Sequence, residues 1–593
     1  MSLLKGKISA LIQCLEFINI SFLLIFTAFL GVFFWFLNFN EILGHDFVYF
    51  FARLHAGQWH FARQGLNIFY FTPHFCGGVP QFGNPQDLFY SLPQFLAIAG
   101  MDIWRASQLS MFASMILGYF GWYLFGRDIV RLNKQWSHVF ALIIIAQGFY
   151  LMHMIAGHLV FFGMPLIGLL LWLIFDRRKC SVRSLITKAA IFSLTSAFIM
   201  YSGGYSVALM AIVAFILFLP FELILNSSKG RLKVLAVRSA ACGLGAIFIN
   251  LSKLTAVWSF MRFIPRAKPF ERFTDGCPFE YMAKAFWAIP QMPELFSFIG
   301  MPDRATHEYS LYLSPIVLVG IVIGFYLLWQ NKSKFKSSVS KSILVVIVTL
   351  VFINFFAQLA RGYGVIVTPL ENLPIFKSLH INVRFLYPFS FILTAAGVYA
   401  LMQWASVRKN ELLISISAGI ITVVAFIIAY YPLMQTNELP RVMPVQTHRE
   451  LVGQYQDFKD KDVTQMLMLK GGLEELIPIF SGSNHIHCYE SLFWQTETFK
   501  NNPITGGAPA VQADGMFNIY NPACLQYPEA NECKPGDRIK AEDGENARQF
   551  LSGQKTTWKI PIWQKLSNWI SLISLIAVLA ILGLNVRKKR HKI

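Results

Sequence analysis

A histidine and an aspartate, His45 and Asp46, follow directly after the first long apolar segment of the chain. A carboxylate within a residue or two of a helix end, at the boundary between lipid and water, loses part of its hydration. It can then act as a base and still be reached by a polar acceptor. A solvated boundary carboxylate without a chemical role is the alternative that position alone leaves open. The dipeptide therefore suggests an enzyme that works at a membrane face.

The elements that must position Asp46 are membrane helices. The chain is 55% hydrophobic and 14% charged, a composition that excludes an ordinary soluble globular protein. We predict an all-α polytopic membrane protein with about twelve transmembrane helices, each about 20 residues long, as about 30 Å of hydrocarbon requires. The apolar runs lie near 16–38, 106–125, 136–152, 159–175, 185–201, 206–225, 234–252, 310–329, 342–358, 385–404, 411–431 and 565–585.

The basic residues of the short connections predict the orientation. If the helices alternate, the Lys and Arg clusters near 127–134, 177–183, 229–233, 332–341 and 587–590 all fall on one side, which is the cytoplasmic side by the positive-inside rule. Both termini are then cytoplasmic. The formal net charge of +19 is spread over helix ends, which does not predict a nucleic-acid partner.

The chain divides into three predicted parts. Residues 1–431 form a transmembrane domain with external loops at 39–104, 253–309 and 359–384. Residues 432–563, which are richer in Gly, Pro, Asn and acidic residues, form a small mixed α/β extramembrane domain. Residues 564–593 form the final transmembrane helix and a basic tail. An oxidising compartment would allow Cys524 and Cys533 to form a disulfide; free thiols are the alternative.

The first external loop has two predicted parts. Residues 47–64 have the apolar spacing of an amphipathic helix on the membrane surface, ended by Gly65. The glycines and prolines of 69–85 prevent regular structure and let the backbone approach a ligand. The aromatic residues there suit sugar faces or lipid chains, or form an interfacial belt. His153 and His158, at a short external turn further along, are interpreted as boundary histidines.

Four short motifs, none diagnostic alone, occur in an order that resembles a known family. Together with an acid after the first helix, they resemble the GT-C superfamily of integral membrane glycosyltransferases, and more narrowly the bacterial YfhO-like and arabinofuranosyltransferase-like membrane proteins. The motifs are GHDF at 44–47, GGVPQFGNPQ at 77–86, HEYSLYL at 307–313 and NVRF at 382–385.

The resemblance implies an inverting transfer of a sugar from a polyprenyl-phosphate-linked donor to a cell-envelope glycan or lipid acceptor, at the external face of a bacterial cytoplasmic membrane. Asp46 inherits the role of general base. Glu308 is a second catalytic candidate, although an acid in a first helical turn can also serve the helix dipole. The donor phosphate needs cations, for which Arg384 is the best placed and Arg262, Arg361 and His380 are further candidates. The candidate substrate-lining residues are His45, His60, Tyr70, Asn84 and Tyr309.

A metal ion is an open question at this stage. The first loop contains no Asp-x-Asp, but Asp46 and Glu308 would share a divalent ion, Mg or Mn, if the enzyme uses one.

Two other functions compete with glycosyl transfer. A lipid or polysaccharide transporter or flippase would place charges deep in its helices, whereas the helix interiors here are nearly free of them. A non-catalytic protein of envelope assembly is the other alternative.

Overall fold

The structure is a computed structural model of the chain. It describes residues 20–178, 181–225, 229–263, 286, 306–330, 384, 386–408, 410–435, 441–468, 476–486, 499 and 502–590. These residues are mainly helical, with three small two-stranded sheets.

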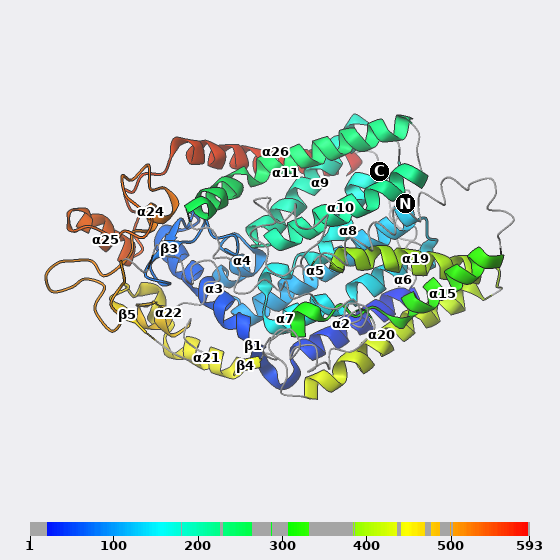
Figure 1. Cartoon of the computed structure of the whole chain (residues 1–593), viewed down its shortest axis with the longest axis horizontal. Coiled ribbons are helices and arrows are strands. Elements are labelled where there is room, and N and C mark those ends of the chain that lie inside the picture. Colours follow the sequence, from blue (N-terminus) through cyan, green and yellow to red (C-terminus); the bar gives the residue numbers. More distant parts are fainter. Residues whose placement is uncertain are drawn as a thin grey trace, which may run out of the picture.

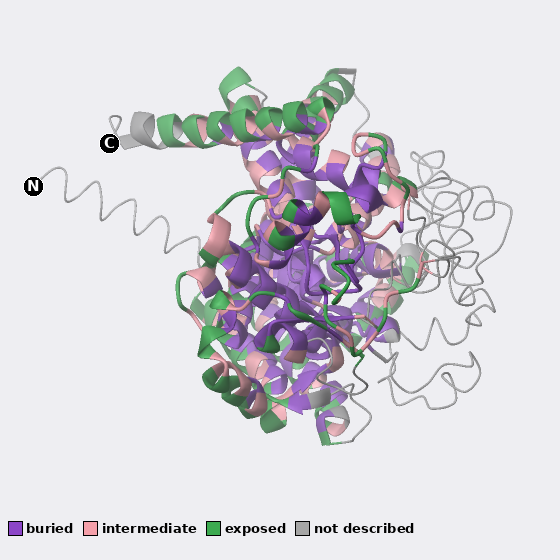
Figure 2. Cartoon of the chain, turned by 90° about the vertical axis from the view of Figure 1, so that its left-hand side faces the viewer, coloured by how far each residue is buried: buried purple, intermediate pink, exposed green. Residues whose placement is uncertain are grey.

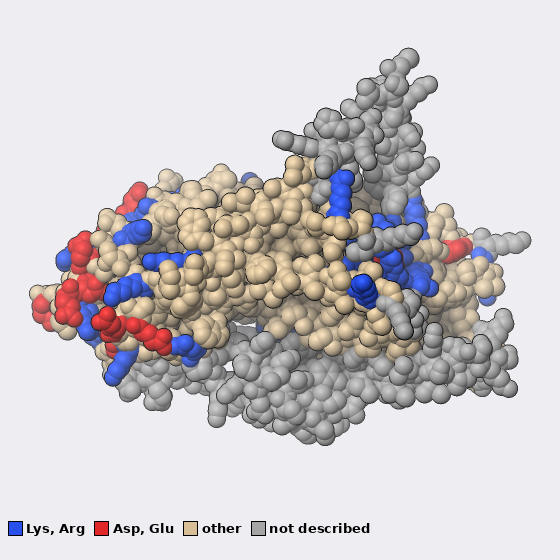
Figure 3. Space-filling model, turned by 90° about the horizontal axis from the view of Figure 1, so that it is seen from above, with Lys and Arg blue, Asp and Glu red and all other residues tan. Residues whose placement is uncertain are grey.

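Nine helical segments within these ranges are long and apolar enough to cross a membrane. They run roughly along the long axis of the molecule (Figure 1). Charged side chains gather at the two ends of that axis, with an uncharged band between them (Figure 3). The segments lie in α2 (Ile20–Leu37), α5 (Ile103–Phe125), α6 (Lys134–Ile145) with α7 (Gly148–Ala156), α9 (Val182–Tyr201), α10 (Tyr205–Leu225), α11 (Lys229–Phe263), α19 (Leu386–Ser406), α20 (Glu411–Gln435) and α26 (Ile562–Arg590).

The predicted multi-pass membrane protein is therefore confirmed. Two shorter apolar helices, α8 (Ile167–Phe175) and α15 (Pro315–Gln330), lie where two further spans are predicted. The span predicted near 342–358 lies outside the described residues.

The bundle is held together by aromatic and small residues. Phe29 and Phe36 of α2 pack against Phe426 of α20, with ring centroids 5.2 and 5.9 Å apart. A Cβ on Gly320 of α15 would overlap the backbone of Gly397 of α19, so glycine permits the close approach of these two helices. The centre of the bundle is buried and its rim is exposed, and the final helix is exposed along much of its length (Figure 2). Exposed apolar side chains on that rim are what contact with lipid requires.

The helix α3 (His45–Gln64) ends at Gly65, as predicted, where the glycine takes a φ of 64°. Its place differs from the prediction, because it does not lie on a surface. Its polar residues Arg53, His55 and His60 are each only 2% exposed. One face packs on the bundle, and segments of the extramembrane domain cover the other. The polar side chains of this helix, which we expected to face water, contact other parts of the protein.

The described residues between 441 and 558, which belong to the predicted extramembrane domain and keep that name below, join the start of α3 through a small sheet. Strand β1 (Ile42–Gly44) pairs antiparallel with β4 (Arg441–Pro444). After β4 come α21 (Val445–Gln454), β5 (Gln465–Leu467), α22 (Ile477–Ser481), β6 (Ser483–His485), α24 (Pro522–Gln526) and α25 (Gly544–Leu551), with β5 and β6 parallel. The domain contains both helices and strands and has an apolar core of its own. The disulfide Cys524–Cys533 is present.

The Gly- and Pro-rich segment of the first loop packs against this domain. Its residues form the hairpin β2 (Phe71–Thr72) and β3 (Val79–Pro80), and α4 (Leu92–Ile98) follows. Gly77, with a φ of 78°, donates its N–H to Asn484 at 3.0 Å and accepts the N–H of Tyr520 at 2.7 Å. In the structure the glycine lets the backbone approach the extramembrane domain. The sequence-based expectation was an approach to a ligand.

A buried pair of histidines links α3 to that domain. The Nε2 atoms of His55 and His448 are 3.1 Å apart, so one ring donates to the other as long as at least one of them is neutral. Burial lowers the pKa of His55 well below 6.5 and the pKa of His448 to about 4. Rings of Phe51, Phe458 and Phe480 surround the pair.

We expect acid to loosen this contact. Between pH 6.5 and the lowered folded-state values, the unfolded or undocked state binds more protons, so stability falls as pH falls. For His448, with a folded-state pKa of about 4, the loss is about 1.5 kcal/mol between about pH 6.5 and pH 5, and His55 acts in the same direction. Hydrogen exchange of the α3 amides, measured across this range, should accelerate at low pH.

The double variant His55→Asn/His448→Gln provides the comparison, because it has no imidazole to protonate. A wild-type acid dependence equal to that of the variant would contradict this account.

Candidate active site

Asp46 stands in the first turn of α3, directly after Gly44 and His45. It is only 6% exposed. One carboxylate oxygen lies 3.1 Å from Nε2 of His45, and the other contacts Nε2 of His158. The N-terminal end of a helix also favours a negative charge. The acid is thus shielded from water and surrounded by imidazoles.

Two glycines allow α3 to begin so close to α7. A Cβ on Gly44 would overlap the backbone of Ile155 and Ala156 at the end of α7. A Cβ on Gly157 would overlap the backbone nitrogen of Phe47. Gly157 caps α7 with a φ of 96°, a left-handed conformation that favours glycine. The turn that follows brings His158 onto Asp46.

A second acid lies beside the first group. Glu308, in the short helix α14 (Thr306–Tyr309), is 3% exposed. Its carboxylate accepts two hydrogen bonds from Arg384, one from Nε at 2.8 Å and one from a terminal nitrogen. The guanidinium lies over the ring of Phe161, 5.0 Å from its centroid. This fork-like pairing fixes the arginine at the entrance of α19.

Four imidazoles join the two acids into one site. Nε2 of His153 and Nε2 of His307 lie 3.3 and 3.4 Å from the carboxylate of Glu308. The ring centroids of His158 and His307 are 4.7 Å apart, and those of His45 and His307 are 5.7 Å apart. We call this site the histidine–carboxylate cluster. It consists of His45, Asp46, His153, His158, His307, Glu308 and Arg384.

The two carboxylates have opposite electrostatic environments. Burial raises the pKa of Asp46 above 3.8, although the charges of His45 and His307 partly offset this effect. Burial would also raise the pKa of Glu308, but Arg384 and His153 hold it well below 4.5. Environments that push two acids apart give them different roles. Glu308 stays ionised beside Arg384, and Asp46 is the acid that can take up and release a proton.

The orientation of His153 favours a cation in the cluster. Its Nδ1 donates to the carbonyl of Phe149 at 2.8 Å, which leaves Nε2 as a lone pair if the ring is neutral. That nitrogen is buried and faces a carboxylate oxygen without a hydrogen bond within the described part of the chain. Two acceptors facing each other need a proton or a metal ion between them.

The donor atoms also have the spacing of a metal site. Two triads have all their donor atoms within 4.8 Å of one another, and His158 belongs to both. The triads are His45, Asp46, His158 and His153, His158, Glu308. Mixed imidazole and carboxylate donors suit Mn²⁺ or Zn²⁺ better than Mg²⁺, which prefers oxygen and water.

The structure brings together four of the residues singled out from the sequence, namely His45, Asp46, Glu308 and Arg384. Arg361, His380 and the side chain of Tyr309 lie outside the described residues. The other four candidates lie outside the cluster. His60 stacks on Phe69, and the Tyr70 hydroxyl accepts a hydrogen bond from Asn568. The backbone carbonyl of Asn84 accepts a hydrogen bond from the ammonium group of Lys253. Arg262 forms an ion pair with Glu529 at the surface.

Sequence reasoning missed three members of the cluster. His153 and His158, interpreted as boundary histidines, are 0% and 13% exposed in their side chains and face the acids. His307 adjoins Glu308 and was not singled out. The available signal was the glycine between His153 and His158, because a helix that ends there turns both histidines toward the same side.

Comparisons with known proteins add little. No protein-family model matches the chain, and no curated protein matches it. Among solved structures, the crystal structure of the Archaeoglobus fulgidus oligosaccharyltransferase, in complex with Zn and sulfate, is similar at 15% identity and a TM-score of 0.35. The match covers 75% of this chain and 58% of that one, so this chain spans less than two thirds of its length. At that TM-score the similarity assigns no role to any residue.

We expect Gly157→Ala to disturb the cluster. The substitution forces a strained φ and an overlap with Phe47, which costs about 1–3 kcal/mol. The melting temperature should fall by several degrees relative to wild type, as measured by the fluorescence of purified protein in detergent.

Gly243→Ala is the matched control, because no atom lies within 4 Å of the added Cβ in α11. Equal melting temperatures for Gly157→Ala and wild type would mean that the close approach of α3 and α7 is not needed.

We expect the cluster to bind Mn²⁺ more tightly than Mg²⁺. At a hundredfold excess of ion over Kd, binding stabilises the folded state by about 2.7 kcal/mol. Titration calorimetry and thermal unfolding with each ion should show this preference, and His158→Gln should abolish it because both triads lose a donor.

His60→Gln, outside the cluster, should keep wild-type ion binding. Retention of Mn²⁺ affinity by His158→Gln, or equal affinity for Mg²⁺, would count against a metal site here.

Proposed function

We propose that this chain is a membrane glycosyltransferase of the GT-C type. It transfers a sugar from a polyprenyl-phosphate donor to an envelope glycan or lipid at the external face of a bacterial cytoplasmic membrane. The observation that carries the proposal is the position of Asp46. It is a buried carboxylate with a raised pKa that lies shortly after the end of the first membrane helix. It belongs to one cluster with an arginine that can bind phosphate.

Asp46 acts as the general base. An acceptor hydroxyl that enters the cluster gives its proton to the carboxylate of Asp46 as its oxygen attacks the anomeric carbon. The bond from the anomeric carbon to the phosphate oxygen breaks, and polyprenyl phosphate leaves with the electron pair. The configuration of the anomeric carbon is inverted, because the transfer is a single displacement and no covalent sugar–enzyme bond is formed.

Arg384 stabilises the leaving phosphate. Its pair with Glu308 uses Nε and one terminal nitrogen, and a guanidinium has a second terminal nitrogen whose two N–H groups can donate to phosphate oxygens. Glu308 acts as a positioning residue, since it holds the guanidinium in place before the donor arrives. A preorganised donor costs no rearrangement as charge develops.

A divalent ion held by one of the two triads, His45 with Asp46 and His158 or His153 with His158 and Glu308, would supply Lewis-acid stabilisation of the phosphate.

The location of the disulfide supports the proposed orientation. Cys524–Cys533 lies in the extramembrane domain, which joins the start of α3 through β1 and β4. Disulfides persist in oxidising compartments. At the opposite end of the long axis the charged side chains are mainly Lys and Arg (Figure 3), as the cytoplasmic side requires.

The decisive variant is Asp46→Asn, which keeps the shape of the side chain and removes the base. We expect release of polyprenyl phosphate from reconstituted protein, supplied with undecaprenyl-phosphate sugars and an envelope extract, to fall by about 10²–10⁴-fold. The wild-type rate should also fall as pH falls, with its midpoint above 3.8 because burial raises the pKa of Asp46.

Glu542→Gln, an exposed acid of the extramembrane domain with a side chain 77% exposed, is the control for loss of one negative charge. Full activity of Asp46→Asn would remove Asp46 from the base role. Lipid movement across vesicles without sugar transfer by wild type would favour a transporter.

A further inference from the structure

A large cavity opens at the other end of α3. Its volume is about 1920 Å³, above the roughly 300–1,000 Å³ of ordinary small-molecule pockets. It lies between the C-terminal part of α3, the linker 553–561 and the helices α9, α11 and α26. Asp46 and His60 are fourteen positions apart on α3, about 21 Å along a helix. The cavity is therefore separate from the histidine–carboxylate cluster.

One part of the cavity is apolar and belongs to membrane helices. It is lined by Leu194, Ala197 and Phe198 of α9, Ile249 of α11, and Leu572 and Leu575 of α26. All three helices are long and apolar enough to span the membrane. Because α26 lies on the outside of the bundle beside α9 and α11 (Figures 1 and 2), this part is at the depth of lipid chains.

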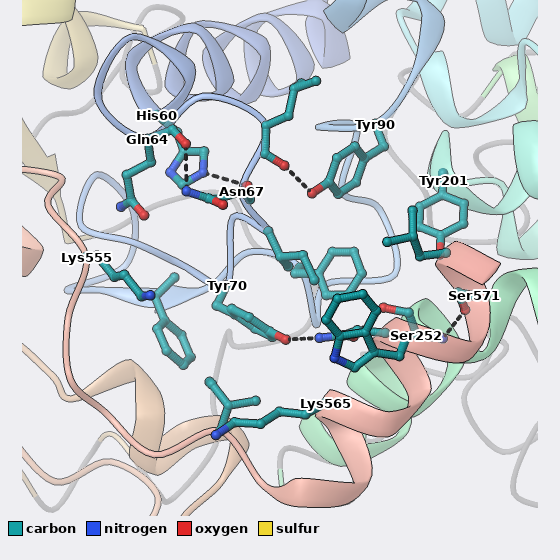
Figure 4. Close-up of a pocket in the computed structure, with 18 of the residues that line it drawn as sticks. His60, Gln64, Asn67, Tyr70, Tyr90, Tyr201, Ser252, Lys555, Lys565 and Ser571 are labelled. Atoms are coloured by element: carbon teal, nitrogen blue, oxygen red, sulfur yellow. Dashed lines mark hydrogen bonds between the residues drawn. The ribbon is translucent and has the colours of Figure 1, made fainter. Parts of the chain in front are cut away.

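The other part is polar and cationic. Figure 4 shows Lys555 to the left of Tyr70 and Lys565 below it. Both lysines are exposed and have no ion pair with any residue the structure describes. A third lining lysine, Lys559, pairs with Glu532 at 3.3 Å. The Tyr70 hydroxyl receives a hydrogen bond of 2.6 Å from Asn568 in α26, which fixes the ring in the lining of the cavity.

Apolar walls at membrane depth and unpaired cations at the boundary match the shape of one class of molecule. An anionic lipid places its chains in hydrocarbon and its phosphate at the interface, where each nearby lysine contributes about 1 kcal/mol, or about fivefold in affinity. Aromatic residues such as Trp558 and Trp569, which also line the cavity, are typical of this boundary.

We propose that this cavity binds an anionic membrane phospholipid, with its phosphate between Lys555 and Lys565 and its acyl chains against α9, α11 and α26. The lipid fills the space between α26 and the bundle and so ties the last helix to the rest of the protein. The proposal does not depend on glycosyl transfer.

The test is lipid retention by the full chain. The protein is reconstituted in a bilayer with equal amounts of phosphatidylglycerol and phosphatidylcholine and is then released from it. Native mass spectrometry measures which lipids stay bound to the protein. We expect phosphatidylglycerol to be retained preferentially. The charge-removing double variant Lys555→Gln/Lys565→Gln should lower its affinity by about twenty-five-fold, or about fivefold for each lysine. Leu572→Trp, which fills the apolar part, should lower retention of both lipids.

Lys534→Gln/Lys540→Gln removes the same charge from exposed sites of the same domain that do not line the cavity, and it should behave as wild type. Equal retention of both lipids by wild type would overturn the proposal, as would equal losses in the two double variants. Glycerol phosphate that displaces the lipid at similar concentration would show that the site binds phosphate alone. Preferential retention of added undecaprenyl phosphate would assign the cavity to a polyprenyl lipid instead.

Discussion

The burial of α3 is the constraint on which the rest of the structure depends. A helix with polar residues such as Arg53, His55 and His60 can be covered by protein only if its polar groups find partners there, because an unpaired buried polar group costs about 1–3 kcal/mol. Arg53 and His60 find local partners, the carbonyls of Tyr49 and Asn67, whereas His55 contacts His448 far along the chain. Two further residues of the helix, Trp59 and Arg63, donate to the carbonyls of Lys461 and Lys459. The extramembrane domain thus fixes the helix that begins with Asp46.

The rigid position of α3 has different consequences at its two ends. At its start, close packing through Gly44 and Gly157 brings carboxylates and imidazoles together in a buried site. In such surroundings electrostatic interactions are stronger than in water, and the pKa values of neighbouring acids diverge. At its end, the helix stops at Gly65 and the chain turns away. This leaves room for the cavity beside α26. A compact site and an open one thus lie along a single helix.

The sequence predicts the elements better than their surroundings. Apolar runs are long and continuous in a membrane protein, so eleven of the predicted spans fall on helices of the structure. The amphipathic pattern of α3 and its end at Gly65 follow equally well from local spacing. The residues that pack on the polar face of α3 cannot be predicted in this way, because they lie about 400 residues further along the chain. Gly77 shows the same limit: its pattern predicts a close approach of the backbone but does not name the partner.

The candidate site could be predicted in part for the same physical reason. Asp46, Glu308 and Arg384 stand at helix ends on one side of the membrane, and topology alone places such residues near one another. His153 and His158 required knowledge of how α7 ends, and His60 and Tyr70 belong to a separate cavity because α3 is about 30 Å long. Residues of one loop are neighbours in sequence, yet a helix between them carries them to different sites. The grouping of residues into sites is therefore determined by the length of α3 and not by their shared loop.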